Sequence, residues 1–498
     1  MGRDADYNAI AQYYGSLHEF SGHMCRKNNR NECGNGKEKE GSSKNKPICD
    51  LSSCPIDGAY LTLSKIGSLV ILFHSPPGCS TGLWILWGGA YSLKSVTGTK
   101  KVTDCITLCT NMNEDDVVYG GTEKLRAAVL DIKERYDPEH AVILSSCCPG
   151  IIGDDFNEVV EEAREKLNMN IGWLDTSGFK SWYWPNGYDL AHQYIVEHIM
   201  EPPDKVEDDT VNIIPYGNAA SADEKECARL LTELGLKVQM PMSVPHTTVE
   251  NIRRAPYAKA NAMMCLTYGW NFCRSMNTRF GTEYSMESHP IGSYFTKKWI
   301  RAIAKIFNKE NEAEAIIQKE MDEIEENIAE LRKELDGKSI AISAGHDKAP
   351  SLLAMALELG LRVCYVGLIT YDDLVKDKIK EVSDMFNYDV ELYVFPQSYE
   401  EIPLVKKYNP DVFIGPAGLT PKNIMMQIPA VSTHFNDFIG PYFGFKGLVN
   451  FGREIRAAIN DPMPRYAPFD FIITGSERVC SEEWYKNFKK REDINEFI

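Results

Sequence analysis

Four cysteines in turns rich in glycine, proline and small residues are the part of this chain best suited to chemistry. Cys54 lies in DLSSCPIDGA, Cys79 in FHSPPGCSTG, and the adjacent Cys147 and Cys148 in LSSCCPGIIGDD. Tight backbone of this kind lets N–H groups point at the sulfides of an iron–sulfur cluster, whose ligands are thiolates. A single cysteine is most simply a small core residue, since free cysteine is among the most buried residue types. The three turns together favour an iron–sulfur cluster, and their spacing is unlike the CxxC pairs of a mononuclear zinc site.

The elements that must position these turns alternate between short apolar runs and amphipathic helical stretches from residue 51 onward. Apolar runs typical of strands lie at 68–73, 141–146, 170–175, 212–217, 339–345, 361–368, 390–395 and 411–416. Helical stretches lie between them at 122–136, 157–167, 222–235 and 352–360. The alternation predicts an α/β fold with mostly parallel sheets covered by helices. Such sheets bind ligands at the carboxyl ends of their strands, and the turn of Cys147 follows an apolar run in this way.

The chain has 498 residues, which is enough for several domains, and shifts in composition predict where they meet. An N-terminal extension is predicted over 1–50, flexible in part because 26–47 is polar and nearly without apolar residues. Three α/β domains are predicted over 51–210, 211–336 and 337–498. The helix predicted over 311–337 carries an apolar stripe of 4-3-4 spacing. A coiled coil is one interpretation of this helix. Packing on its own domain is favoured, because the stripe is under three heptads.

The length, composition and net charge of the chain exclude several classes of function. The formal net charge of −17 argues against nucleic acid or an anionic membrane as a partner. The chain has no run of eighteen apolar residues and no signal-peptide layout at its start, so a cytoplasmic protein is expected. Its fourteen cysteines then favour free thiols or metal ligands over disulfides. Because no GxxxxGK[ST] motif occurs, any ATP that the chemistry needs must be bound by another chain.

Two of the cysteine turns resemble those of the nitrogenase component 1 family, of the molybdenum–iron protein type. FHSPPGC (73–79) is similar to the family's His-Gly-Pro-x-Gly-Cys turn, with Ser75 in place of glycine, and 145–155 is similar to its Cys-Pro-x-x-x-Ile-Gly-Asp-Asp turn. The resemblance implies that Cys54, Cys79 and Cys147 are this chain's share of a P-cluster-type iron–sulfur cluster between two unlike subunits. The spacing to the Gly-Asp-Asp sequence selects Cys147. Cys148 stays the alternative ligand. It occupies a position where the family often has proline, so the two cysteines can also be aligned in the other register.

Two further stretches resemble the segments that hold the family's active-site iron–sulfur cofactor. Counting back from Phe280-Gly281 places Cys265 on the cofactor's cysteine ligand, with Cys273 as its rival. His434, six residues before Gly440-Pro441-Tyr442, falls on the histidine ligand. His192, in YDLAHQYIVEH, resembles the histidine that contacts the cofactor near the substrate and is the predicted catalytic residue. A buried structural histidine is the simpler interpretation of either histidine alone.

The resemblance implies both an architecture and an activity. Three Rossmann-like domains are expected around a buried metallocluster site. The chain would be the catalytic α-type subunit of a nitrogenase-like reductase, paired with a homologous β-type subunit in an α2β2 assembly. A second copy of this chain is the alternative partner. An ATP-hydrolysing iron protein dimer would deliver the electrons. Rival functions are a cofactor-assembly scaffold, a subunit of a tetrapyrrole reductase, and a non-catalytic regulator that binds a cluster.

The chain departs from dinitrogen reductases at several positions that the family uses around its cofactor. Tyr188 stands where the family has glutamine, and Gly418 stands near the lysine that holds the cofactor's organic acid, with Lys422 the nearest replacement. A buried tricarboxylic acid needs paired positive charge, which the family's lysine supplies. Without that lysine, the sequence does not predict which organic acid the cofactor carries, nor whether its metal is iron only, molybdenum or vanadium. The departures point toward the methylthio-alkane reductases, the branch of the family that cleaves C–S bonds. The pocket around the cofactor is also expected to be more apolar than in dinitrogen reductases, because its lining would include Trp84, Trp87, Trp182 and Trp184.

Overall fold

The computed structural model describes most of the chain between residues 54 and 464. The described residues are 13–16, 54–81, 105–181, 184–215, 222–243, 247–345, 348–369, 373–394, 396–416, 419, 423–424, 427–433, 441–462 and 464. They fall into two compact units, of which unit 1 spans Ser52–His289 with Lys298–Ile316, and unit 2 spans Pro290–Lys297 with Ile317–Ile498 and includes residues 13–16. Three sheets make up these units, two in unit 1 and one in unit 2.

The first sheet of unit 1 is parallel, with the strand order β3-β2-β4-β5. Its strands are β2 (Leu69–His74), β3 (Ile106–Cys109), β4 (His140–Ser145) and β5 (Ile171–Asp175). Its helices are α2 (Pro55–Leu63), α4 (Glu114–Tyr119), α5 (Thr122–Arg135), α6 (Cys147–Ile152), α7 (Phe156–Leu167) and α8 (Pro185–His198).

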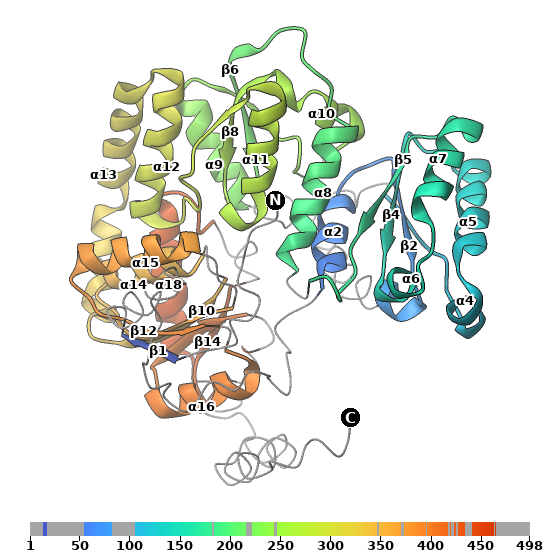
Figure 1. Cartoon of the computed structure of the whole chain (residues 1–498). Helices are drawn as coiled ribbons and strands as arrows, with labels where there is room; N and C mark the ends of the chain where they lie inside the picture. The colour runs from blue at the N-terminus through green and yellow to red at the C-terminus, as the bar shows by residue number, and fades with distance from the viewer. Residues whose placement is uncertain are drawn as a thin grey trace, which may run out of the picture. The chain divides into compact units, whose positions relative to one another are not determined.

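Helices cover both faces of this first sheet, which is why its central strands are apolar throughout. Leu69, Ile71 and Phe73 of β2 pack with residues of α2 and α8, whereas Val70 and Leu72 pack with residues of α5 and α7. This alternation is the two-residue period of a strand buried on both sides. Figure 1 shows α2 and α8 on one face of the sheet and α5 and α7 on the other.

The second sheet of unit 1 is also parallel, with the order β7-β6-β8-β9. Its strands are β6 (Glu207–Ile214), β7 (Lys237–Gln239), β8 (Ala258–Met263) and β9 (Glu283–Tyr284). The helical elements between and after its strands are α9 (Ala222–Glu233), α10 (Val249–Arg253), η1 (Ala255–Tyr257), α11 (Leu266–Phe280) and α12 (Gly292–Phe307). A buried amide pair, Asn212 Nδ2 to Asn261 Oδ1 at 2.9 Å, joins β6 to β8.

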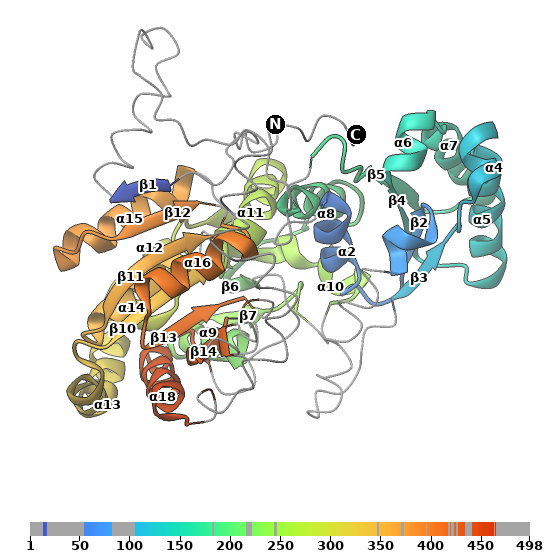
Figure 2. The same cartoon turned by 90° about the horizontal axis from the view of Figure 1, so that it is seen from below.

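Unit 2 contains the third sheet, with the order β1-β12-β11-β10-β13-β14. The strands are β1 (Tyr13–Ser16), β10 (Ser339–Ala344), β11 (Arg362–Leu368), β12 (Glu391–Val394), β13 (Val412–Gly415) and β14 (Ala430–Ser432). The helices are α14 (Ala349–Glu358), α15 (Asp373–Phe386), α16 (Ser398–Tyr408) and α18 (Lys446–Asn460). All pairings are parallel except that of β1, which joins the edge strand β12 antiparallel, as Figure 2 shows.

The long helix α13 (Glu310–Leu335) packs on its neighbours in unit 2 through the predicted apolar stripe. Ile324, Ile328, Leu331 and Leu335 of this stripe are buried. The helix lies against α18, since Arg456 of α18 forms ion pairs with Glu330 and Glu334. The helix is thus amphipathic and packs within the chain, but its partner α18 belongs to the predicted domain 337–498 and not to 211–336, the predicted domain of the helix itself.

The α/β fold class predicted from the sequence is confirmed. Each predicted strand lies within about two residues of an observed strand, except that β6 starts five residues before its predicted beginning at 212. The strands β1, β3, β7, β8, β9 and β14 are not among the predicted ones. The domain boundaries near 210 and 337 stay predictions. None of the helices in the described part of the chain is long and apolar enough to span a membrane.

Candidate functional site

The carboxyl ends of the strands in the first sheet bring the predicted cysteines to one edge. The turn that carries Cys79 follows the end of β2 at His74, and Cys147 opens α6 two residues after the end of β4. Because β2 and β4 are parallel neighbours, paired from Leu69↔His140 to His74↔Ser145, both turns emerge at the same edge. We call this edge the cysteine edge.

Cys54 reaches the cysteine edge from outside the sheet, because it is the N-cap residue of α2. The turn after β5 lies against both Cys54 and Cys147. The backbone N–H of Gly178 in this turn donates to Cys147 Sγ at 3.2 Å. A Cβ atom at Gly178 would lie 3.1 Å from Cys54 Cβ and 3.4 Å from Cys147 Sγ. Glycine at 178 thus keeps the space between the two cysteines free of a side chain.

The thiols of the cysteine edge are close enough to influence one another electrostatically. Burial raises the pKa of the Cys54 thiol, and the charge of Cys147 raises it further, although the Ile56 amide opposes both. Burial also raises the pKa of the Cys79 thiol, with further increases, in decreasing order, from Cys54, Cys147, Cys148 and Cys109. Thiols of this kind keep their protons at neutral pH until a metal displaces them, so metal binding would release protons.

The donor set of the cysteine edge fits a cluster better than one metal ion. Cys54, Cys79 and Cys147 are all half-buried free thiols. Among the residues that the structure describes, no three His, Cys, Asp or Glu side chains converge closely enough to hold a single ion. Thiolates spread around a glycine-lined space suit the larger core of an iron–sulfur cluster.

The structure distinguishes Cys147 from Cys148 by their surroundings. Cys147 Sγ accepts a hydrogen bond from the Gly178 amide and lies beside Cys54. Cys148, in contrast, acts on the cysteine edge through its charge, which raises the pKa of Cys79. Backbone N–H donors to sulfur are a common feature around cluster ligands. These contacts favour Cys147, the residue that the sequence spacing selects.

A buried hydrogen-bond network ties the two cysteine turns together through His74 and Asp154. His74 Nε2 lies 2.9 Å from Asp154 Oδ2, and His74 Nδ1 lies 3.0 Å from Thr110 Oγ1. Since a carboxylate only accepts, Nε2 carries the proton, and Nδ1 accepts from the hydroxyl of Thr110. That hydroxyl in turn accepts the Ser75 amide at 3.2 Å, and Asp154 Oδ1 accepts the Gly121 amide at 2.7 Å. Burial lowers the pKa of His74, with Asp154 opposing it, so the imidazole is neutral at pH 7.

The Asp154→Ala variant should lose about 3 kcal/mol of unfolding free energy, because His74 and the Gly121 amide would be left buried without an acceptor. The measurement is urea denaturation of the apoprotein. Asp155→Ala is the matched control, since Asp155 only caps α7 by accepting the Glu158 amide at 2.9 Å, which is worth about 1 kcal/mol. Equal losses in the two variants would contradict a special role for the network.

A second group of predicted residues lies at the carboxyl end of β8 in unit 1. Cys265 follows this strand by two residues and is the N-cap of α11, where its Sγ accepts the Tyr268 amide at 3.3 Å. The fully buried His192 of α8 packs edge-on against the Tyr268 ring at 4.6 Å between centroids. Both residues therefore contact Tyr268, Cys265 at its backbone amide and His192 at its ring.

Aromatic side chains surround His192. The rings of Tyr188 and Phe272 lie with centroids 6.5 and 5.0 Å from the imidazole, and Trp184 packs against Tyr188 at 5.0 Å. The rival ligand Cys273 is fully buried in the core on α11, and burial raises its pKa well above the usual value. That setting suits a packing role.

Several predicted positions lie outside the described residues. They include the proposed cofactor ligand His434, the positions Gly418 and Lys422, and three of the four tryptophans, Trp84, Trp87 and Trp182. The roles predicted for them stay predictions.

Three contributors to these sites were not singled out from the sequence. Gly178 and Thr110 act through contacts with residues far away in the chain, so no local signal marks them. Lys65 did carry a signal, because it is a lysine between two apolar runs. It is fully buried, with Nζ 4.9 Å from the centroid of the Tyr268 ring, the ring against which His192 packs.

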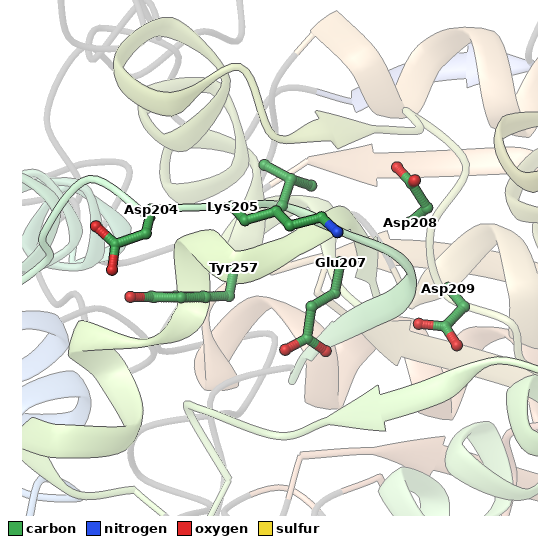
Figure 3. A pocket seen from close by; sticks show the side chains of 7 residues that line it. Asp204, Lys205, Glu207, Asp208, Asp209 and Tyr257 are labelled. Atoms are coloured by element: carbon green, nitrogen blue, oxygen red, sulfur yellow. The ribbon is translucent and has the colours of Figure 1, made fainter.

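A pocket of about 380 Å³ lies elsewhere in unit 1, at the start of β6. Figure 3 shows that the carboxylates of Asp204, Glu207, Asp208 and Asp209 point in different directions around Lys205. Asp209 also forms an ion pair with Lys237 at 3.0 Å. Carboxylates that diverge in this way do not form a cation site, so the cysteine edge and the Cys265 region remain the candidate sites.

Comparison with known proteins found a matching family model and a similar solved structure. A family model described as "Nitrogenase component 1 type Oxidoreductase" matches residues 54–460, which contain both candidate sites. The solved structure "Nitrogenase Cp1 at pH 5" superimposes with a TM-score of 0.69 at 21% identity, covering 86% of this chain and 92% of that one. At this identity the match supports the fold alone.

Two relatives from Methanococcus maripaludis represent two different functions. The nitrogenase iron-molybdenum cofactor biosynthesis protein NifE is 28% identical over 434 residues, covering 84% of this chain and 87% of the relative. The nitrogenase molybdenum-iron protein alpha chain is 28% identical over 380 residues, covering 75% of each.

Proposed function

Because the chain belongs to the nitrogenase component 1 type oxidoreductase family, we propose that it is the catalytic α-type subunit of a nitrogenase-like metallocluster reductase. A homologous β-type subunit completes an α2β2 assembly in the cytoplasm, and an ATP-hydrolysing iron protein dimer supplies the electrons. The observation that carries the proposal is the gathering of Cys54, Cys79 and Cys147 at one sheet edge within the matched residues.

The cysteine edge is proposed to hold a P-cluster-type iron–sulfur cluster, which relays single electrons when bound. Cys54, Cys79 and Cys147 supply its thiolates from this chain. The Gly178 amide, directed at Cys147 Sγ, stabilises negative charge on that sulfur. The pairing of His74 with Asp154 holds the turns of Cys79 and Cys147 at a constant separation, so the ligands do not have to be ordered when iron arrives.

Cys265 and His434 are the proposed ligands of an active-site iron–sulfur cofactor, with iron alone, molybdenum or vanadium as its metal. His192 is proposed to deliver protons to the substrate, since imidazole exchanges protons near neutral pH. The aromatic rings around His192 exclude water from its surroundings. An apolar environment of this kind favours as substrates the C–S compounds that methylthio-alkane reductases cleave, and dinitrogen is the alternative substrate.

A cofactor-assembly scaffold is the second candidate function, and the similarity to NifE favours it. At equal identity, NifE aligns with 84% of this chain and the alpha chain with 75%. A scaffold would keep the cysteine edge, because it also needs clusters. It would not need His434 as a permanent ligand, so this residue separates the two functions.

The test is anaerobic co-purification with the homologous subunit, followed by counts of iron, molybdenum and vanadium. About sixteen irons per pair are expected if both clusters are present, and the His434→Ala variant should lose about half of them together with iron-protein-dependent reduction. Reduction is assayed with dinitrogen and with a methylthio-alkane. A variant with unchanged iron and unchanged function would favour the scaffold, and about eight irons or fewer in the wild type would exclude the catalytic site.

A further inference from the structure

A second pocket lies in unit 1, at the side of the first sheet that ends with β5. Its volume is about 200 Å³, and its walls come from β5, α7 and α8. These two helices cover opposite faces of the sheet (Figure 1), so the pocket spans the sheet edge between them. It contains none of the residues proposed for the clusters. A cavity of this size can hold one substituted ring, because roughly 150 Å³ is enough for benzene.

Two aromatic side chains form fixed walls of this pocket. The Trp173 ring stacks on Phe156 at 4.6 Å between centroids, and its Nε1–H donates to Asn157 Oδ1 at 2.8 Å. The Tyr194 ring lies directly against β5, because Gly172 has no side chain. A Cβ atom at Gly172 would lie 2.3 Å from a carbon of that ring. Both walls are therefore in place before a ligand arrives, as is usual for small-molecule sites.

Arg164 adds a permanent positive charge to the pocket. Its Nε–H donates to the Ile171 carbonyl oxygen at 2.8 Å, which fixes the guanidinium group. Within the described part of the chain, no hydrogen bond or ion pair involves the two terminal nitrogens of this side chain. A guanidinium group held in this way presents its terminal N–H groups to an acceptor, and their spacing matches the two oxygens of a carboxylate.

The charge of Arg164 also acts on the wall that α8 contributes. Burial raises the pKa of Tyr194, and Arg164 opposes that increase. Burial lowers the pKa of His198, and Arg164 lowers it further, whereas Glu197 opposes the decrease and Arg279 adds a smaller one. The His198 imidazole is therefore neutral at pH 7, with one N–H to donate. One guanidinium group and one neutral imidazole suit a ligand with a single negative charge.

We propose that this pocket binds a small aromatic carboxylate, with the carboxylate on Arg164 and the ring against Trp173 and Tyr194. His198 supplies an additional N–H donor from α8. A monocarboxylate is favoured over phosphate, because Glu161 lines the same pocket and its charge repels a dianion more strongly. The site needs no iron and shares no residue with the proposed clusters, so it goes beyond the proposed function.

The test measures the binding of benzoate to the full chain by isothermal titration calorimetry, with benzamide as the uncharged probe of the same shape. Benzoate should bind about tenfold more tightly than benzamide, since its hydrogen bonds with Arg164 are between charged groups. The Arg164→Met variant should lose about tenfold in affinity for benzoate and bind benzamide as the wild type does. Lys166→Met is the matched control, because Lys166 is a cation of the same helix that pairs with Glu162 outside the pocket.

A second variant, His198→Leu, removes the other donor from an exposed position, where folding tolerates the change. It should weaken benzoate binding about threefold. Far-ultraviolet circular dichroism checks that each variant is folded. Equal affinities of the wild type for benzoate and benzamide would overturn the proposal, and so would equal benzoate binding by Arg164→Met and Lys166→Met. Inorganic phosphate that binds as tightly as benzoate would overturn the assignment to carboxylates.

Discussion

The Cys147→Ala variant, co-purified with the β-type subunit, should lose about eight of the sixteen or so irons per pair that two large clusters imply. The reason is that Cys147 contributes both a thiolate and the sulfur that the Gly178 amide contacts. Iron-protein-dependent reduction should fall with it, since the relay is lost. Because the side chain is half-buried, the unfolding free energy of the apoprotein should change by less than about 1 kcal/mol.

Cys148→Ala is the control, because it removes a neighbouring half-buried thiol from the same helix. It should keep its iron, and the absorbance of the clusters should match that of the wild type. If Cys148→Ala loses iron and Cys147→Ala does not, then the alternative register is the right one. Equal iron in both variants and in the wild type would show that the cysteine edge holds no cluster.

The Gly187→Ala variant should lose about 3 kcal/mol of unfolding free energy and a large part of its cluster iron. A Cβ atom at Gly187 of α8 would lie 1.8 Å from the Pro55 carbonyl oxygen and 2.5 Å from the Ala59 amide nitrogen of α2. These are backbone atoms of a fully buried helix, so the two helices would have to separate. Alanine is the better helix former by about 1 kcal/mol, which is too little to offset the overlap. The separation would shift Cys54, the N-cap residue of α2.

Gly67→Ala is the matched control for this variant. A Cβ atom at Gly67 would lie 3.5 Å from its nearest neighbour, the Thr247 carbonyl oxygen, which is an ordinary contact. Its unfolding free energy in urea and its iron content should both stay near the wild-type values. A Gly187→Ala protein as stable as Gly67→Ala would mean that α2 and α8 do not approach as closely as described.

The sequence predicts the central strands and helices well because their signals are local. In β2 and β4, apolar side chains continue without interruption, which is typical of strands covered on both faces, and α5 and α7 carry apolar positions at helical spacing. The spacing of residues between His74 and Cys79 and between Cys147 and Asp154 is likewise a property of the chain itself. These patterns were sufficient for the α/β fold and for the family.

What the sequence by itself determined is therefore the type of most elements and the cysteine turns that follow two of the strands, β2 and β4. Only the tertiary structure decided which thiols meet. Cys54 reaches Cys147 because α2 packs on α8 through Gly187 and the Gly178 turn leaves space between them. The end of β3 lies beside β2, with Cys109 opposite Phe73, because β3 pairs with β2 rather than with β4. Strand order and helix approach depend on contacts between residues far apart in the chain, and these leave no periodic signal in the sequence.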